Sequence, residues 1–292
     1  MNMKSLALAL ALAIALPTPA MALVITPTNT NAADTLLNAV LAPSSGINVV
    51  GGSVQFIGKT TVGSEQSATY TGLNLAPSDG IGATITNPDG ILLTSGHANM
   101  PTTNTVSNFS NAKTQPGTGS NAALTTLSGK STFDQNFISF NFTVASGNAV
   151  TASFVFVSDE YPTQTVTDIF GFFVDGKNYA FFPGGALVSN IPQANFQNNP
   201  VGSGKYATEY NGLTTSLFVT GLLDPTLTTH TLMIAVADTN DSVWDSGVFI
   251  GNVKAGTGTG GGGIGEVPEP ASLALLGIGL AGLGAARRRK TA

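Results

Sequence analysis

The sequence predicts a mainly β protein, a single domain built as a β-sandwich or jelly roll, and three observations support this class. Several segments alternate apolar and polar residues with the two-residue period of a strand, among them residues 133–144 and 149–157. Turn residues separate such segments, as in Asn87-Pro88-Asp89-Gly90 and in Asp175-Gly176. Helical periodicity is nearly absent, and many short strands divided by turn signals are typical of sandwiches and jelly rolls.

The expected elements follow one another along the central part of the chain. A Leu/Ala stretch at 33–41, with Asp34 as a possible N-cap, predicts one helix. Strands are expected at 47–57, 80–85, 90–94, 133–144, 149–157, 169–174, 178–182, 215–220, 231–237 and 247–253. No linker interrupts these strands, so we expect one domain over residues 33–254.

The N-terminus has the pattern of a secretory signal peptide. Lys4 provides a positive charge, and residues 6–16 form an apolar run that is too short to cross a membrane. Ala20-Met21-Ala22 then supplies the small residues that signal peptidase recognises. We expect a signal helix in residues 1–22 that is removed on export.

The C-terminus carries a second targeting pattern. Residues 255–266 are rich in glycine and predict a flexible linker. The segment 267–292 then contains an apolar run at 273–286 that ends in cations, which predicts a short membrane helix with its C-terminus inside. A full span needs about 20 residues, so this helix suits transient anchoring in the inner membrane. The residues that define the pattern are Pro268, Glu269, Pro270, Arg287, Arg288 and Arg289.

This tail resembles the PEP-CTERM sorting signal of Gram-negative bacteria. The likeness rests on the Pro-Glu-Pro triplet, the apolar stretch and the terminal arginine cluster, in that order at the end of the chain. The resemblance implies that an exosortase, a membrane cysteine protease, removes the tail and passes the protein to the cell surface or the extracellular matrix.

The composition limits the possible partners. The chain has no cysteine and only 9% charged residues, so the exported domain depends on its core or on bound ions rather than on disulfides. Residues 23–265 contain 14 acids and six lysines, a net charge near −8. We therefore expect no nucleic-acid partner, and an acidic surface of this kind suits divalent cations.

Six of these acids occur in two segments that follow apolar strands. If the strands lie side by side, or cross closely in two sheets, the carboxylates meet at one edge and need a counter-charge. Calcium binds six to eight oxygen atoms, often from inter-strand loops. The sequence therefore predicts calcium as a cofactor, with its ligands among Asp159, Glu160, Asp168, Asp238, Asp241 and Asp245. The alternative is that these aspartates cap turns.

The same segments resemble the choice-of-anchor L domain. The likeness covers about residues 33–254 and rests on four motifs: GILLTSG at 90–96, SDEYP at 158–162, DIFGFF at 168–173 and ADTNDSVWDSGVFI at 237–250. The resemblance implies a surface domain attached to its host by a separate anchor, and it implies no activity.

These observations predict an exported, non-enzymatic protein of the cell surface or extracellular matrix of a Gram-negative bacterium. Its expected role is adhesion or scaffolding, with exopolysaccharide or surface glycans as a candidate partner. One alternative is a carbohydrate-binding module in which Tyr206, Tyr210 or Trp244 stacks on sugar rings. The other is a glycan-processing enzyme that uses Asp159 and Glu160. Adjacent residues of an extended chain point to opposite faces, so this pair is a poor catalytic pair, and no catalytic residue is assigned.

Overall fold

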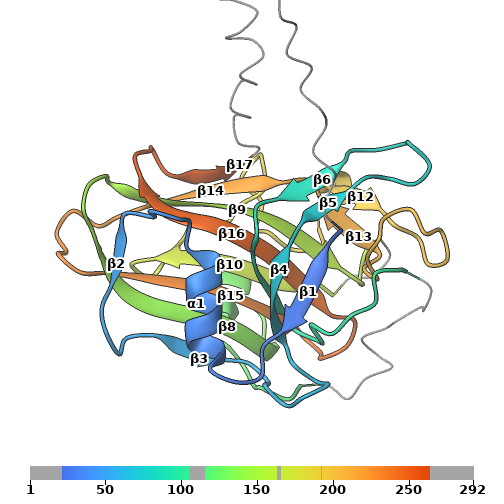
Figure 1. The fold of residues 1–292 in the computed structure, drawn as a ribbon, viewed down its shortest axis with the longest axis horizontal. Helices are drawn as coiled ribbons and strands as arrows, with labels where there is room; N and C mark the ends of the chain where they lie inside the picture. The colour runs from blue at the N-terminus through green and yellow to red at the C-terminus, as the bar shows by residue number, and fades with distance from the viewer. Residues whose placement is uncertain (1–21, 105–115, 163–165, 192, 264–292) are drawn as a thin grey trace, which may run out of the picture.

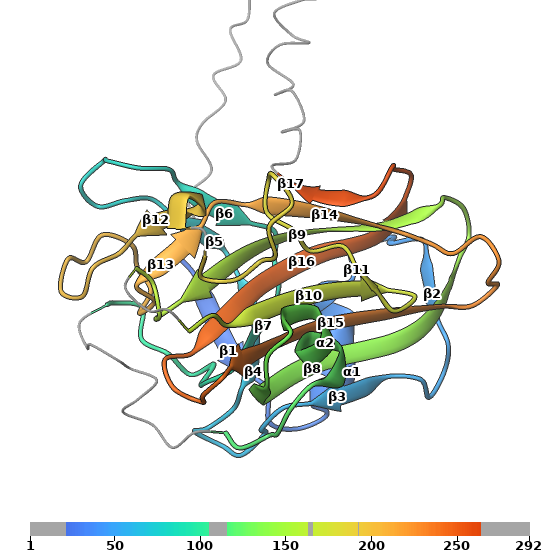
Figure 2. The same ribbon diagram turned by 180° about the vertical axis from the view of Figure 1, so that it is seen from behind.

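The computed structural model describes residues 22–104, 116–162, 166–191 and 193–263. These residues form two large antiparallel sheets, with nine and six strands, and a small two-stranded sheet (Figures 1 and 2). The mainly β prediction is therefore confirmed. The signal peptide, the sorting helix and the residues Pro268, Glu269, Pro270, Arg287, Arg288 and Arg289 lie outside the described residues.

The nine-stranded sheet is centred on the pair β16 and β9. Its strand order is β1 (Val24–Pro27), β4 (Ser67–Thr71), β7 (Gly90–Thr94), β16 (Ser246–Gly256), β9 (Ala149–Ser158), β13 (Gly212–Thr214) and β12 (Phe196–Asn198). The far edge of β9 pairs with two strands in turn. Its C-terminal end meets β13, and the rest of it meets β14 (Leu217–Leu222), which in turn pairs with β17 (Gly261–Gly263).

The six-stranded sheet lies against the first. Its strand order is β11 (Lys177–Asn178), β10 (Ile169–Val174), β15 (His230–Thr239), β8 (Thr132–Val144) and β2 (Ile47–Val49), and β3 (Gln55–Ile57) also pairs with β8. The small sheet pairs β5 (Leu73–Leu75) with β6 (Ile85–Asn87). The predicted tight turn at Asp175-Gly176 joins β10 to β11, and both of its residues have the positive φ that this turn requires, 50° and 78°.

The core between the sheets is made of aromatic and branched side chains from both. Phe154 of β9 and Phe170 of β10 meet across the two sheets with their ring centroids 5.1 Å apart. Along β15 the side chains alternate: Ile234 and Val236 join the core between the sheets, whereas Ala235 joins a smaller cluster on the outer face. Consecutive apolar residues thus bury β15 on both faces.

Within the described residues, two α-helices and one 3₁₀ helix complete the fold. The predicted helix is α1 (Ala32–Val40), which buries Leu36 and Val40 in the main core; its N-cap is Asn31, and Asp34 lies in the first turn instead. The helix α2 (Ala122–Ser128) covers the outer face of the six-stranded sheet, as Figure 2 shows, and it was not predicted because two turns are too short to show a period. The 3₁₀ helix is η2 (Gln193–Asn195).

Some boundaries differ from the expected ones. The sheet begins at Val24 because β1 pairs with β4, and β16 extends to Gly256. Part of the glycine-rich stretch at 255–266 is therefore strand rather than linker, since β17 pairs with β14. Glycine is needed there because a Cβ on Gly262 would come within 2.4 Å of the backbone oxygen of Phe181. The strands expected at 80–85 and 178–182 are mostly loop.

We predict that Phe154→Ala lowers the free energy of unfolding by about 3–5 kcal/mol, because it leaves a cavity in the core between the sheets. Chemical denaturation of the full-length chain measures this change. The matched control is Phe218→Ala on the neighbouring strand β14, where the ring is 36% exposed and the change should stay within about 0.5 kcal/mol. Equal losses for the two variants would contradict this assignment of the core.

Candidate functional site

Six acidic side chains are buried together at one end of the sandwich, where strands of both sheets begin or end. We call them the acidic cluster: Asp159, Glu160, Asp168, Glu209, Asp238 and Asp245. None of the six is more than 3% exposed. Acidic residues are seldom buried without a partner, so this cluster is the first candidate for a functional site.

The pairing of the strands brings the two predicted segments together. In the nine-stranded sheet Ser158 of β9 lies opposite Ser246 of β16, and the backbone N–H of Asp159 donates to the carbonyl oxygen of Asp245 at 3.1 Å. In the six-stranded sheet Ile169 lies opposite Ala237. Asp168 and Asp238, the next residues outward on β10 and β15, are therefore neighbours.

A chain of hydroxyl groups connects the two sheets at this point. The Oγ of Ser246 donates to the Oδ2 of Asp168 at 2.6 Å and lies 2.8 Å from the Oγ of Ser158. Ser246 and Ser158 belong to the nine-stranded sheet, whereas Asp168 leads into β10 of the six-stranded sheet. This short bond connects the two sheets beside the cluster.

Asp238 points between the sheets because it continues the alternation of β15. It follows Ile234 and Val236 at two-residue steps, so its side chain lies on the face that packs against the other sheet. The partner strand β8 carries an extra residue here, which shifts the register between Val236 and Asp238. Asp134, in this bulge, has a φ of 47°. A bulge at the end of a strand commonly redirects side chains beside a site.

Asp245 occupies space that a glycine leaves open. A Cβ added to Gly96 would come within 1.6 Å of the Oδ2 of Asp245, so no larger residue fits at position 96 while this carboxylate stays in place. The GILLTSG segment at 90–96 thus contributes to the cluster through its last glycine.

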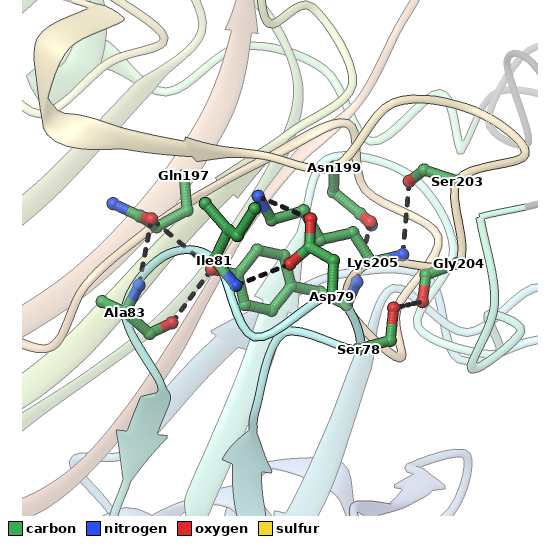
Figure 3. A network of polar contacts seen from close by, with 10 residues as sticks. Ser78, Asp79, Ile81, Ala83, Gln197, Asn199, Ser203, Gly204 and Lys205 are labelled. Carbon is green, nitrogen blue, oxygen red and sulfur yellow. Dashed lines mark hydrogen bonds and ion pairs between the residues drawn. The ribbon is translucent and has the colours of Figure 1, made fainter.

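Glu209 enters the cluster from the loop between β12 and β13, which is held from two sides. Asn199 holds the backbone on both sides of Glu209, because its Nδ2 donates to the carbonyl oxygens of Thr208 and Tyr210, at 3.0 and 2.8 Å. Figure 3 shows how this loop is tied to residues 78–83, with Lys205 and Asp79 forming an ion pair at 3.3 Å.

Further hydrogen bonds join residues 78–83 to β12 and to the loop that follows it. Tyr206 donates to the carbonyl oxygen of Ala83 at 2.9 Å, Ser78 donates to that of Gly204 at 2.9 Å, and the Oε1 of Gln197 accepts from the N–H of Ala83 at 3.2 Å (Figure 3). The position of Glu209 is therefore set by the backbone around it.

Burial and mutual repulsion raise the pKa values of four acids of the cluster. Burial, together with the charge of Asp238, raises the pKa of Glu160 to about 9. Burial also raises the pKa of Asp168, Asp238 and Glu209 well above the usual range, and in each case a neighbouring carboxylate adds to the effect. The interacting pairs fall into two groups, one around Asp168 and Asp238 and one around Asp159 and Glu209, and Asp245 acts on both.

The carboxylates are close enough to repel but are not arranged around a single point. Among the described residues no group of three or more His, Cys, Asp or Glu side chains has the spacing of a formed metal site. The arrangement can hold protons shared between carboxyls, as in the hydrogen bond between Glu209 and Asp159.

Comparison with known families places this geometry in context. A family model of the choice-of-anchor L domain matches residues 24–254, and a model of the PEP-CTERM protein-sorting motif matches residues 266–290.

The chain belongs to the choice-of-anchor L family.

No curated protein and no solved structure matches the chain. Within the described residues, no helix has both the length and the apolar character needed to span a bilayer.

Within this choice-of-anchor L domain, five of the six predicted site residues lie together: Asp159, Glu160, Asp168, Asp238 and Asp245. Asp241 differs from them because it is exposed and its Oδ1 accepts from the N–H of Val243 at 3.2 Å, as a turn cap does, although its charge also adds to the raised pKa of Glu160. Glu209 was missed, since a single acid in a polar loop has no local pattern that marks it.

We predict that the domain becomes less stable as pH rises from about 4.5 to about 9 when calcium is chelated. Because the folded pKa of Glu160 lies above its unfolded value, the folded state holds more protons in this window and loses that advantage as pH rises. Denaturation of the full-length chain at several pH values measures the trend, and Glu160→Gln should reduce its slope, leaving the share of Asp168, Asp238 and Glu209. Stability that increases toward neutral pH would contradict the assignment.

Proposed function

We propose that this protein is a non-enzymatic component of the bacterial cell surface or extracellular matrix, where the β-sandwich acts in adhesion or scaffolding. The sorting motif at 266–290 indicates an exported, surface-sorted protein that an exosortase-type system processes. The observation that carries the proposal is the combination of this tail with a folded domain in which the side chains of the acidic cluster are buried. The domain is delivered to the surface and offers a rigid body there.

The burial of the acids supports a structural role over a catalytic one. A glycosidase places two carboxyl groups on either side of a bound sugar, so both must reach the substrate. Here Asp159 and Glu160 are 1% and 2% exposed, and they interact with different partners, Glu209 and Asp238. The pair therefore faces the protein interior rather than a groove.

The aromatic residues also fit a structural role. Tyr206 and Tyr210 are 0% and 1% exposed, so neither offers a ring face to a sugar, which speaks against the alternative of a carbohydrate-binding module that uses these two rings. The OH of Tyr210 lies 3.2 Å from the Oγ1 of Thr94, and that of Tyr206 donates to Ala83. Both rings are core residues with a polar end that is satisfied inside the protein.

Two shallow hollows lie away from the cluster. One, of about 490 Å³, is lined by residues 41–48 together with Asn38. The other, of about 380 Å³, lies beside the turn of Asp175 and includes Tyr179 and Asp224. Neither contains a residue of the acidic cluster, so a glycan that contacts either hollow would be held at the surface without meeting the cluster.

The proposal is tested in the exporting host with two chains, the full-length protein and Glu269→Ala. For the full-length protein we expect matrix-associated material that lacks peptides from residues 273–292, and for the variant we expect retention with the membrane. Loss of cell-to-cell adhesion in the variant strain would support the role.

An activity control accompanies this experiment. The purified protein is incubated with the host's exopolysaccharide, and new reducing ends are measured. Shortening of the polymer by the full-length chain, abolished in Glu160→Gln, would overturn the non-enzymatic proposal in favour of a glycan-processing enzyme.

A further inference from the structure

We propose that residues 257–263, which we call the glycine latch, dock on the edge of the nine-stranded sheet and slow the processing of the sorting tail until they are released. The inference rests on the proposed function, because it takes the tail at 266–290 as the substrate of an exosortase-type system. It goes beyond that function by giving the folded domain a part in the timing of its own processing.

The glycine latch lies on the sheet with every second residue facing the protein. These inward residues are partly buried glycines, Gly258, Gly260 and Gly262, whereas residues 257, 259 and 261 between them are exposed. A Cβ on Gly258 would come within 2.5 Å of the Cγ2 of Thr220, and a Cβ on Gly262 would come within 2.4 Å of the backbone oxygen of Phe181. Such alternation and such close contact are properties of a docked strand, whereas a free linker has neither.

The side chain of Asn148 holds the latch where it leaves β16. Its Nδ2 donates to the carbonyl oxygen of Gly258, and its Oδ1 accepts from the N–H of the same residue, both at 3.1 Å. The amide thus pairs with both backbone groups of Gly258, as a neighbouring strand would. Beyond this point residues 261–263 pair with β14, which lies beside β17 in Figures 1 and 2.

The glycine latch fits its place closely but is weakly held. Its strand β17 has three residues, all of them glycines, and glycine loses more backbone freedom on folding than any other residue. The two hydrogen bonds from Asn148 are exposed to solvent, where water competes for the same groups. Segments with few buried apolar contacts and exposed hydrogen bonds open locally while the rest of a fold stays intact. The latch can therefore be released without unfolding the sandwich.

Docking of the latch shortens the free chain in front of the sorting motif. The motif begins three positions after the last residue of β17. Because an extended chain covers at most about 3.6 Å per residue, the docked latch keeps the start of the motif within about 11 Å of Gly263. Release of the latch back to Gly256, where β16 ends, lengthens this reach to about 36 Å. A protease binds several residues on each side of the bond it cleaves in extended form. A folded domain held this close hinders that binding, so the docked state is the slowly processed one.

The first test asks whether the latch docks in solution. A Cβ on Gly258 lies 3.7 Å from the Cβ of Thr220, within the range of about 3.5–4.5 Å that a disulfide spans. The chain has no cysteine of its own, so Thr220→Cys with Gly258→Cys should form a disulfide in the full-length chain on mild oxidation. The matched control is Thr220→Cys with Thr259→Cys, whose second position is exposed and faces away, and it should oxidise more slowly. Equal rates for the two pairs would mean an undocked segment and would overturn the proposal.

The second test measures the rate of processing in the exporting host. Newly made protein is pulse-labelled, and the loss of residues 273–292 is followed with time. Gly262→Val cannot dock, because its side chain meets the backbone of Phe181, and Asn148→Ala removes two hydrogen bonds at an exposed position that does not endanger the fold. Both variants should lose the tail about threefold faster or more, because the population of the open latch governs access. The matched control, Thr259→Val on the exposed face, should be processed at the unmodified rate.

The outcomes separate the latch from the proposed function. Tail removal at one rate in every chain would overturn the latch and leave the proposed function in place. Slower removal in Gly262→Val and Asn148→Ala would also overturn it, because the docked segment would then present the tail rather than withhold it. If no chain loses its tail, including the unmodified one, the proposed function fails and the latch fails with it.

Discussion

The folded state of this domain depends on how it neutralises six carboxyl groups buried where its two sheets meet. Apolar burial provides most of the stability, but that burial is non-directional and would tolerate a sliding of one sheet over the other. The polar contacts at the cluster end are directional. The bond from Ser246 to Asp168 and the pairing of Asp159 with Asp245 hold the strands of both sheets in a fixed relation. Burying the carboxyl groups of the cluster costs free energy, but their directional hydrogen bonds favour a single arrangement of the core.

Residues outside the cluster make its position possible. Gly96 leaves the volume that the carboxylate of Asp245 fills, and the amide of Asn199 holds the backbone on both sides of Glu209. The loop network of Asp79, Lys205 and Tyr206 supports Asn199 in turn. A surface feature drawn in Figure 3 is therefore coupled to a buried site through a short series of hydrogen bonds.

Export of the protein explains why the domain needs this source of stability. A chain without cysteines cannot use the disulfides on which many secreted domains rely, so its stability outside the cell comes from its core and from polar contacts. The first strand, β1, starts two residues after the expected signal cleavage at Ala22, and the last, β17, ends close to the start of the sorting motif. The folded domain thus occupies nearly the whole span between the two targeting segments.

The sequence by itself determined the class of the fold and the destination of the protein. Two-residue alternation is a local property, so strands such as β9 and β15 were predicted nearly to their ends, and the targeting segments are contiguous motifs that need no fold to be recognised. The tertiary structure alone decided the membership of the acidic cluster. Whether Asp238 faces the core while Asp241 faces solvent, and whether Glu209 meets Asp159 across about 50 residues, depends on strand pairing and loop anchoring. Those contacts join residues distant in sequence, and no local pattern encodes them.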